Sequence, residues 1–360
     1  MKHIVREGSW HPRTASIVID NYNYSTFLGR AIDSALGQTH KAQVIVVDDG
    51  SSDNSREIIL SYGDRIDPVL KTNGGHASAF NAGYMRAKGD LVLFLDSDDM
   101  MERYSIETLL KVWRSDSVVT HFPMTVIDKD DAEVGTVPDP YSKLADGDVL
   151  YELLSKGYFA STVTSGMAFA HDLLEQIIPI PEKTYFQGAD GYLLRAAAFF
   201  GPFQYVDKRL ARYRVHNRND SNPWGERRTI VGGFRHRLDL EQNFLETIRD
   251  FASRFDTPAP SDLGNGNPTY VSSRLFSLLL DPPGHPINGD RRLSLLRNFI
   301  AVYRTMPLPA YRRIAWITVA TVSTFAGKST AATLIKWMGD ANSRPAWIKQ
   351  IGRQLKRRKS

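Results

Sequence analysis

The 360-residue sequence contains no cysteine. This absence excludes disulfide bonds and thiolate metal ligands, so any bound metal must be held by carboxylates, imidazoles or phosphates. No apolar segment of the secretory type follows the first basic residues, which predicts a cytoplasmic protein. Long apolar runs are also lacking. Residues 314–326 form the longest run near the end, and this run is shorter than the roughly 20 residues that span a bilayer.

Net charge is small, at +5, and it is unevenly placed. Seven Arg and Lys residues lie in residues 344–360 with no acid among them, so the rest of the chain is slightly acidic. A nucleic-acid-binding body is therefore not expected. In the same tail, Trp347, Ile348, Ile351 and Leu355 fall on one helical face. The tail could contact the inner membrane surface, contact nucleic acid, or be a solvated disordered end; its Trp and basic residues favour peripheral contact with an anionic membrane.

Short β-rich runs alternate with segments of helical spacing through the first 100 residues, and this alternation predicts βαβ units with a parallel sheet. The predicted strands are residues 15–19, 44–47, 68–70 and 91–95. Polar residues follow three of them: Asp20 to Asn23, Asp48-Asp49 and Asp96 to Asp99. Ligands of open parallel sheets bind beyond the carboxyl ends of the strands, so we expect these three clusters to converge.

The second half of the sequence has mainly helical spacing. Helices are predicted over residues 230–255, 269–280, 291–305 and 311–325, with linkers at 264–268 and 281–290. The fold class expected is an α/β sheet flanked by helices, with a C-terminal helical extension. The predicted domains are residues 1–222, residues 223–306 and amphipathic basic helices at 307–360, which could associate with a membrane.

The densest chemical signal is Asp96-Ser97-Asp98-Asp99, directly after a buried strand. Three carboxylates within four residues repel one another unless a cation is present, and their hard oxygens suit Mg²⁺ or Mn²⁺. These acids could instead cap the helix that follows. The loop Asn73-Gly74-Gly75 adds backbone that can approach a ligand closely. Neighbouring His76 could meet that ligand or simply be solvated.

Six ordered segments of the first 220 residues resemble family 2 glycosyltransferases of the GT-A fold. They are SIVI with NYN at 16–23, SALGQT at 34–39, VVDDGSSD at 46–53, NGG at 73–75, NAG at 81–83 and LDSDD at 95–99. The resemblance implies a GT-A fold, in which a mostly parallel sheet binds a nucleotide-sugar donor, most often a UDP-sugar. The donor contacts that it implies are Tyr22, Asn23, Asp48, Asp49, Asn73, Gly75, Asn81, Asp96 and Ser97.

The same resemblance implies the catalytic groups. Asp98 is the expected metal ligand of a D-x-D motif, with Asp96 facing the ribose. Asp190 lies in the segment that supplies the catalytic base, although Ala189 stands where an acid is common; Asp190 could also cap its helix. In the segment YRVH at 213–216, His216 would complete the metal shell or steady the departing diphosphate. Arg214 and Ser221 are the expected diphosphate contacts.

The predicted reaction is direct displacement at the anomeric carbon with inversion, aided by Mn²⁺ or Mg²⁺. The expected acceptor is a saccharide or lipid-linked saccharide of polysaccharide or cell-envelope assembly, and no nucleic acid partner is expected. The alternative is an inactive binding module that retains the fold and is tethered by its basic tail. Loss of donor hydrolysis on Asp98→Asn would distinguish the enzyme from the module.

Overall fold

The computed structural model describes residue 4, residues 10–216 and 230–339, and residues 343 and 345. The chain divides into two compact units. Unit 1 comprises Met1–His216 and Asn243–Leu263, and unit 2 comprises Asn217–Gln242 and Gly264–Ser360. The domain borders predicted after residues 222 and 306 stay a prediction.

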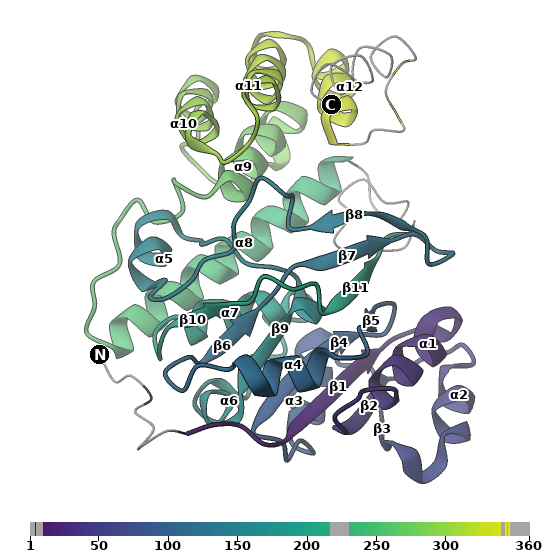
Figure 1. Ribbon diagram of the computed structural model, residues 1–360. Coiled ribbons are helices and arrows are strands. Elements are labelled where there is room, and N and C mark those ends of the chain that lie inside the picture. The colour runs from purple at the N-terminus through teal and green to yellow at the C-terminus, as the bar shows by residue number, and fades with distance from the viewer. Residues whose placement is uncertain (1–3, 5–9, 217–229, 340–342, 344, 346–360) are drawn as a thin grey trace. The chain divides into compact units, whose positions relative to one another are not determined.

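Unit 1 is built on a seven-stranded sheet with the order β10-β6-β9-β4-β1-β2-β3 (Figure 1). The strands β3, β2, β1 and β4 are parallel, whereas β9 runs antiparallel to both β4 and β6. This mixed, mostly parallel sheet with flanking helices confirms the predicted fold class. The strands are β1 (Ala15–Asn21), β2 (Gln43–Asp49), β3 (Asp67–Lys71), β4 (Leu91–Asp96), β6 (Val119–His121), β9 (Met167–Ala170) and β10 (Phe203–Tyr205).

The helices of unit 1 follow from their apolar spacing. In α1 the buried residues are Leu28, Ala31, Ile32 and Ala35, a stripe of period 3.6. In α3, Gly83 has no Cβ, which lets the helix approach β1: a Cβ there would lie 2.2 Å from a methyl carbon of Val18. The helices are α1 (Ser25–Leu36), α2 (Ser55–Ser61), α3 (His76–Tyr84), α4 (Ser105–Val112), α5 (Leu150–Lys156), α6 (His171–Ile177) and α7 (Ala189–Ala197).

A second, four-stranded sheet has the order β5-β11-β7-β8. Its strands are β5 (Met100–Met101), β7 (Met124–Ile127), β8 (Glu133–Val137) and β11 (Ala211–Arg214). β5 begins immediately after Asp99, and Met101 pairs with Ala211 of β11. This pairing brings the segment after β11 beside the segment after β4, which the local sequence pattern did not predict.

The long helix α8 (Ile230–Arg254) contributes to both units, because its residues from Asn243 onward belong to unit 1. There, the Tyr185 ring stacks on Phe244 with centroids 5.9 Å apart. The hydroxyl of Tyr185 also donates to the backbone oxygen of Asn243 at 2.8 Å. These contacts hold the segment that precedes α7.

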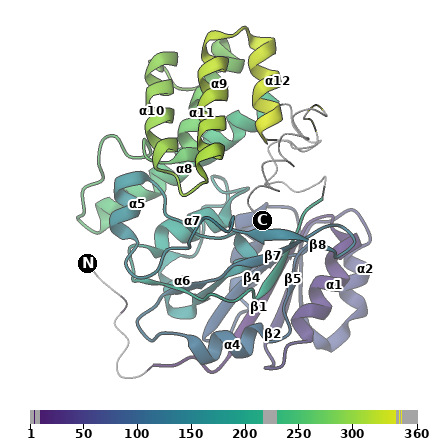
Figure 2. The ribbon, with the colours of Figure 1, turned by 45° about the horizontal axis from the view of Figure 1, so that its top comes forward.

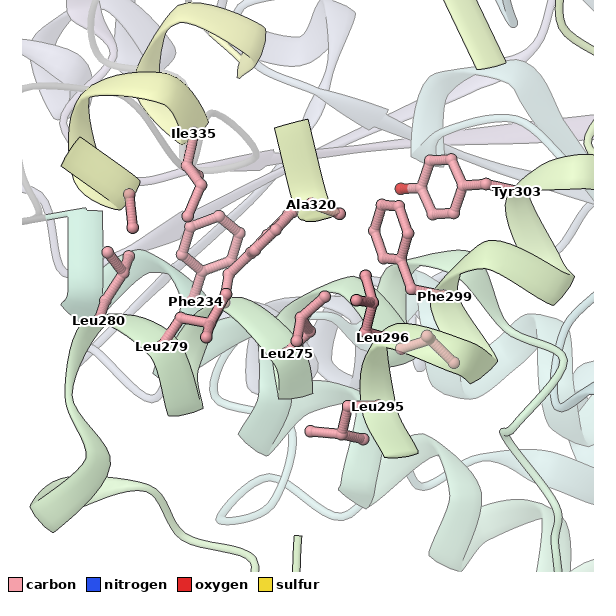
Figure 3. Packing of buried hydrophobic residues seen from close by; sticks show 13 residues of the cluster. Phe234, Leu275, Leu279, Leu280, Leu295, Leu296, Phe299, Tyr303, Ala320 and Ile335 are labelled. Atoms are coloured by element: carbon pink, nitrogen blue, oxygen red, sulfur yellow. The ribbon is translucent and has the colours of Figure 1, made fainter. Parts of the chain in front are cut away.

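Unit 2 is helical, with α9, α10, α11 and α12 packed side by side (Figures 1 and 2). Its core contains Leu275, Phe276, Phe299, Ala320 and Ile335. Figure 3 shows Leu275, Phe299, Ala320 and Ile335 gathered between the helices. Within the described ranges, no helix has both the length and the hydrophobicity needed to cross a bilayer. The helices are α9 (Pro268–Leu280), α10 (Arg292–Thr305), α11 (Ala310–Phe325) and α12 (Lys328–Gly339), close to the ranges predicted for the first three.

Candidate active site

The register of the parallel strands aligns the polar residues that end them. Asp20 of β1 pairs with Asp96 of β4, and Asn21 pairs with Asp48 of β2. The carboxyl ends of these strands therefore meet at one edge of the sheet, as expected for a ligand site of an open α/β sheet.

Four carboxylates gather at this edge: Asp20, Asp96, Asp98 and Asp99, which we call the acidic cluster. Oxygens of Asp96, Asp98 and Asp99 lie within 4.8 Å of one another, as do ligand atoms of Asp20, His76 and Asp96. Burial, followed by the charges of Asp20, Asp99 and Asp98, raises the pKa of Asp96 well above its usual value. Burial and the charge of Asp98 likewise raise the pKa of Asp99.

The acidic cluster fits a divalent cation. Among the described residues, the buried Oδ1 of Asp20 and Oδ2 of Asp99 have no hydrogen-bond partner. Unpaired buried oxygens are costly, and a cation would satisfy them while relieving the repulsion between the carboxylates. A set of carboxylate oxygens and imidazole nitrogens suits Mg²⁺ or Mn²⁺. The residues present are thus compatible with the predicted metal.

The strand β11 brings His216 to the acidic cluster. The Nε2 atom of His216 lies 2.9 Å from Oδ2 of Asp98, although 118 positions separate the two residues. The imidazole stacks on Phe27 at a centroid distance of 5.1 Å and meets the Tyr24 ring edge-on at 5.6 Å. Two aromatic rings of α1 and its N-terminal flank therefore fix the imidazole against Asp98. The structure brings together the two residues predicted to share the metal.

Arg214 lies beneath the acidic cluster and has no solvent exposure. Its backbone N–H donates to Oδ1 of Asp99 at 2.8 Å, and its Nε donates to the backbone oxygen of Asp98 at 2.8 Å. Its Nη1 donates to Asp128 O at 2.9 Å and pairs with Asp131. The guanidinium group of Arg214 has no accessible surface in this structure. Its predicted contact with the diphosphate of a donor stays a prediction. What the structure shows is a side chain that holds the Asp98-Asp99 turn.

Asp48 ties β1 to the turn that follows β2. Its carboxylate is fully buried and accepts hydrogen bonds from Asn21 Nδ2 at 3.1 Å, Ser51 N at 3.1 Å and Arg56 Nε at 2.8 Å. The carboxylate is therefore neutralised by Arg56, which the sequence analysis did not single out. Asp48 shapes the edge where the nucleoside of a donor was predicted to bind.

Asn23 and Tyr22 form the rim beside this turn. Asn23 has a φ of 60°, a conformation that asparagine tolerates better than most residues, and its Oδ1 accepts from Ser52 N at 2.8 Å. The neighbouring Tyr22 ring is 48% exposed. An exposed aromatic ring at the edge of a ligand site offers a stacking surface to a flat ring such as a nucleobase.

Asp49 organises the loop after β3. Its Oδ1 accepts from Lys71 Nζ at 2.6 Å and Gly74 N at 2.9 Å, and its Oδ2 accepts from Gly75 N at 2.7 Å and from Asn73 Nδ2 at 3.1 Å. All these donors come from the protein itself. The observed role of Asp49 is thus to fix the loop 71–75. The contacts predicted for Asp49, Asn73 and Gly75 with a nucleotide-sugar donor stay predictions.

The same loop positions Asp190. Gly75 has a φ of 85°, and a Cβ there would lie 2.6 Å from the Phe186 ring, so only glycine fits. His76 N donates to Phe186 O at 2.8 Å, and Ala189 N donates to His76 Nδ1 at 3.3 Å. These bonds dock the segment before α7 onto the start of α3. The charge of Asp190 is one of those that raise the pKa of Asp96 and of Asp20, so Asp190 lies within electrostatic range of the acidic cluster.

The structure also excludes the capping interpretations. Gly188 is the N-cap of α7, and Asp190 lies in the first turn without capping it, so the capping alternative for Asp190 is wrong. Tyr104 is the N-cap of α4 and no side chain caps that helix. The Asp96–Asp99 acids therefore do not cap it either.

The remaining predicted donor contacts occupy different environments. Both ends of the Asn81 amide bond to the backbone of Ile180, at 2.8 and 3.0 Å, so this side chain fastens the segment that leads to α7. Ser97 is buried within the acidic turn. The donor contacts predicted for Asn81 and Ser97 stay predictions. Ser221 and the tail 346–360 lie outside the described residues.

Sequence reasoning missed the roles of Asp20 and Asp99 and left His76 undecided. Burial raises the pKa of Asp20 to about 6, an effect partly offset by His76, whose Nε2 lies 3.8 Å from Oδ2 of Asp20. The signal for Asp20 was its place as the first polar residue at the end of a predicted strand. The signal for Asp99 was its place in an unusually dense acidic run.

Known proteins that resemble this chain are glycosyltransferases. Residues 16–162 match the model of the family described as glycosyl transferase family 2. An uncharacterized glycosyltransferase of Nostoc sp. is 34% identical over 211 residues, covering 57% of this chain and 66% of its own. The glycosyltransferase GlyA of Streptococcus pneumoniae is 26% identical over 272 residues, covering 71% of this chain and 39% of its own. The chain thus spans less than two thirds of the length of these curated relatives.

A crystal structure of residues 1–349 of S. aureus TarS has a TM-score of 0.50 to this structure at 16% identity. The alignment covers 89% of this chain and 90% of that one. At this level of identity, the likeness supports the fold alone.

Proposed function

Because this chain belongs to glycosyl transferase family 2, we propose that it is an inverting glycosyltransferase that moves a sugar from a nucleotide-diphosphate donor to a hydroxyl acceptor. The donor proposed is a UDP-sugar. The observation that carries the proposal is the acidic cluster. In this cluster Asp98 contacts His216, and among the described residues Oδ1 of Asp20 and Oδ2 of Asp99 have no hydrogen-bond partner. Such a cluster is costly in a protein that binds no cation there.

The metal proposed is Mn²⁺ or Mg²⁺, held by Asp98 and His216, with Asp96 and Asp99 adjacent. When bound, it would offset the negative charge that develops on the leaving diphosphate. Tyr22 and Asn23, on the rim beside buried Asp48, are proposed to receive the nucleoside, with the base stacked on the exposed Tyr22 ring. Asp96 is proposed to face the ribose.

Asp190 is proposed to be the general base. Its carboxylate accepts the proton of the acceptor hydroxyl as the oxygen attacks the anomeric carbon, and the bond from that carbon to the diphosphate oxygen breaks. The attack comes from the face opposite the leaving group, so the configuration inverts. The docking of Ala189 on His76 supports this role, because it holds the first turn of α7 near the acidic cluster.

Arg214 is proposed to act as a positioning residue. Its bonds to Asp98 and Asp99 fix the turn on which the metal site depends. The acceptor proposed is a saccharide or lipid-linked saccharide of cell-envelope or polysaccharide synthesis. A cytoplasmic location is part of this proposal, and so is a membrane contact through residues 344–360. Of that segment, the structure describes only residue 345.

The test is release of nucleoside diphosphate from UDP-, GDP- and dTDP-sugars with Mn²⁺, with and without EDTA. We expect release from one donor that EDTA abolishes and that Asp98→Asn lowers at least about 100-fold. The matched control is Asp130→Asn, since the Asp130 side chain is 70% exposed and forms an ion pair with the neighbouring Lys129. Neither release nor nucleotide binding by calorimetry across the panel would favour the inactive binding module instead.

A further inference from the structure

The helix α11 of unit 2 exposes an apolar face. Ile314 is 63% exposed, Val322 46% and Phe325 72%, and Tyr311 at the start of the helix is 37% exposed. Successive helical residues are rotated by about 100°, so these four side chains fall within an arc of about 80°. We call this face the α11 ridge. Its opposite side is buried, because Ala320 belongs to the core of unit 2 (Figure 3).

The α11 ridge gathers most of the exposed large apolar side chains in the described part of unit 2. Among the large apolar side chains that are exposed in the described part of unit 2, the ridge supplies all except Leu293. Single exposed apolar residues are ordinary on protein surfaces, but a row along one helix face marks an interaction surface. The short, mixed-polarity helix cannot itself cross a bilayer.

The segment that carries the ridge has charges of one sign in its sequence. Residues 291–339, which cover α10, α11 and α12, contain no Asp or Glu. The same stretch carries eight cations: Arg291, Arg292, Arg297, Arg304, Arg312, Arg313, Lys328 and Lys336. A stretch of three helices whose formal charges are all positive favours contact with an extended anionic surface.

We propose that the α11 ridge docks on the surface of an anionic lipid bilayer. The apolar side chains leave water for the boundary between headgroups and acyl chains, while arginines and lysines of α10, α11 and α12 meet lipid phosphates. A nucleic acid would match the charge but offers phosphates, not apolar surface, to Ile314 and Phe325. This contact is separate from the one predicted for residues 344–360, and it does not depend on the proposed catalytic activity.

The experiment is flotation of the full-length protein with vesicles of phosphatidylcholine alone or with about 30% phosphatidylglycerol. The ridge variant is Ile314→Ser with Phe325→Ser. The matched control is Leu60→Ser with Met85→Ser, two side chains of unit 1 that are 60% and 77% exposed. Because all four side chains are exposed, neither variant should change the urea-unfolding midpoint. A second ridge variant, Val322→Ser with Phe325→Ser, repeats the test should the first fail to fold.

We expect wild type and control to float with the phosphatidylglycerol vesicles and less with phosphatidylcholine alone, and added NaCl to weaken binding. The ridge variants should lower the partition coefficient by about tenfold or more. Wild-type protein that stays unbound, or ridge variants that bind as tightly as wild type, would overturn the proposal. A wild-type dimer without vesicles that the ridge variants convert to a monomer would also overturn it, by assigning the ridge to a second copy of this chain.

Discussion

Replacing Arg214 by methionine tests whether this buried guanidinium stabilises the turn of the acidic cluster. Methionine keeps much of the apolar stem but removes the donors to Asp98 O and Asp128 O and the ion pair with Asp131. Each of the two buried acceptors left without a donor costs about 1–3 kcal/mol. The ion pair with Asp131, whose side chain is 37% exposed, adds no more than about 1 kcal/mol. We expect the free energy of unfolding to fall by about 3–5 kcal/mol.

Arg212 offers a matched control on the same strand. Its ion pair with Glu102 is partly exposed, with side chains 39% and 31% accessible, so Arg212→Met should cost only about 0.2–1 kcal/mol. The assay is urea unfolding followed by far-UV circular dichroism. With an m value of about 2 kcal/mol per molar, Arg214→Met shifts the midpoint by about 2 M and Arg212→Met by less than about 0.5 M. Equal shifts for the two variants would refute the assigned role of Arg214.

Two further predictions concern the carboxylates. Asp190→Asn should lower kcat for sugar transfer by about 100-fold to 10,000-fold with little change in donor affinity, measured by calorimetry; unchanged kcat would exclude it as the base. The pKa of Asp20 is about 6 in the folded state, above its usual 3.8, so between these pH values the folded state binds more protons than the unfolded state. The free energy of unfolding of the metal-free protein should therefore fall by about 2–3 kcal/mol as pH rises from 4 to 6. Asp20→Asn should flatten this decline in EDTA, and a pH profile identical to wild type would contradict the assignment.

The sequence predicted much of unit 1 because its signals are local. Apolar runs that end in acids mark β1, β2 and β4, and the stripe of Leu28, Ala31 and Ile32 marks α1. The convergence of their polar ends followed from the parallel topology alone. Alternation over residues 209–215 predicts the strand β11, but the second sheet was not predicted, because β5 has only two residues and pairs with β11 across more than 100 residues.

The sequence by itself determined which chemical groups stand at the strand ends and, to within one residue, where α9, α10 and α11 begin and end. Only the tertiary structure decided what each group does. Asp49 is satisfied by loop donors, whereas Oδ1 of Asp20 is left without a partner among the described residues. The physical reason is that pairing, accessibility and pKa depend on burial and on charges that lie far apart in the chain but close in space.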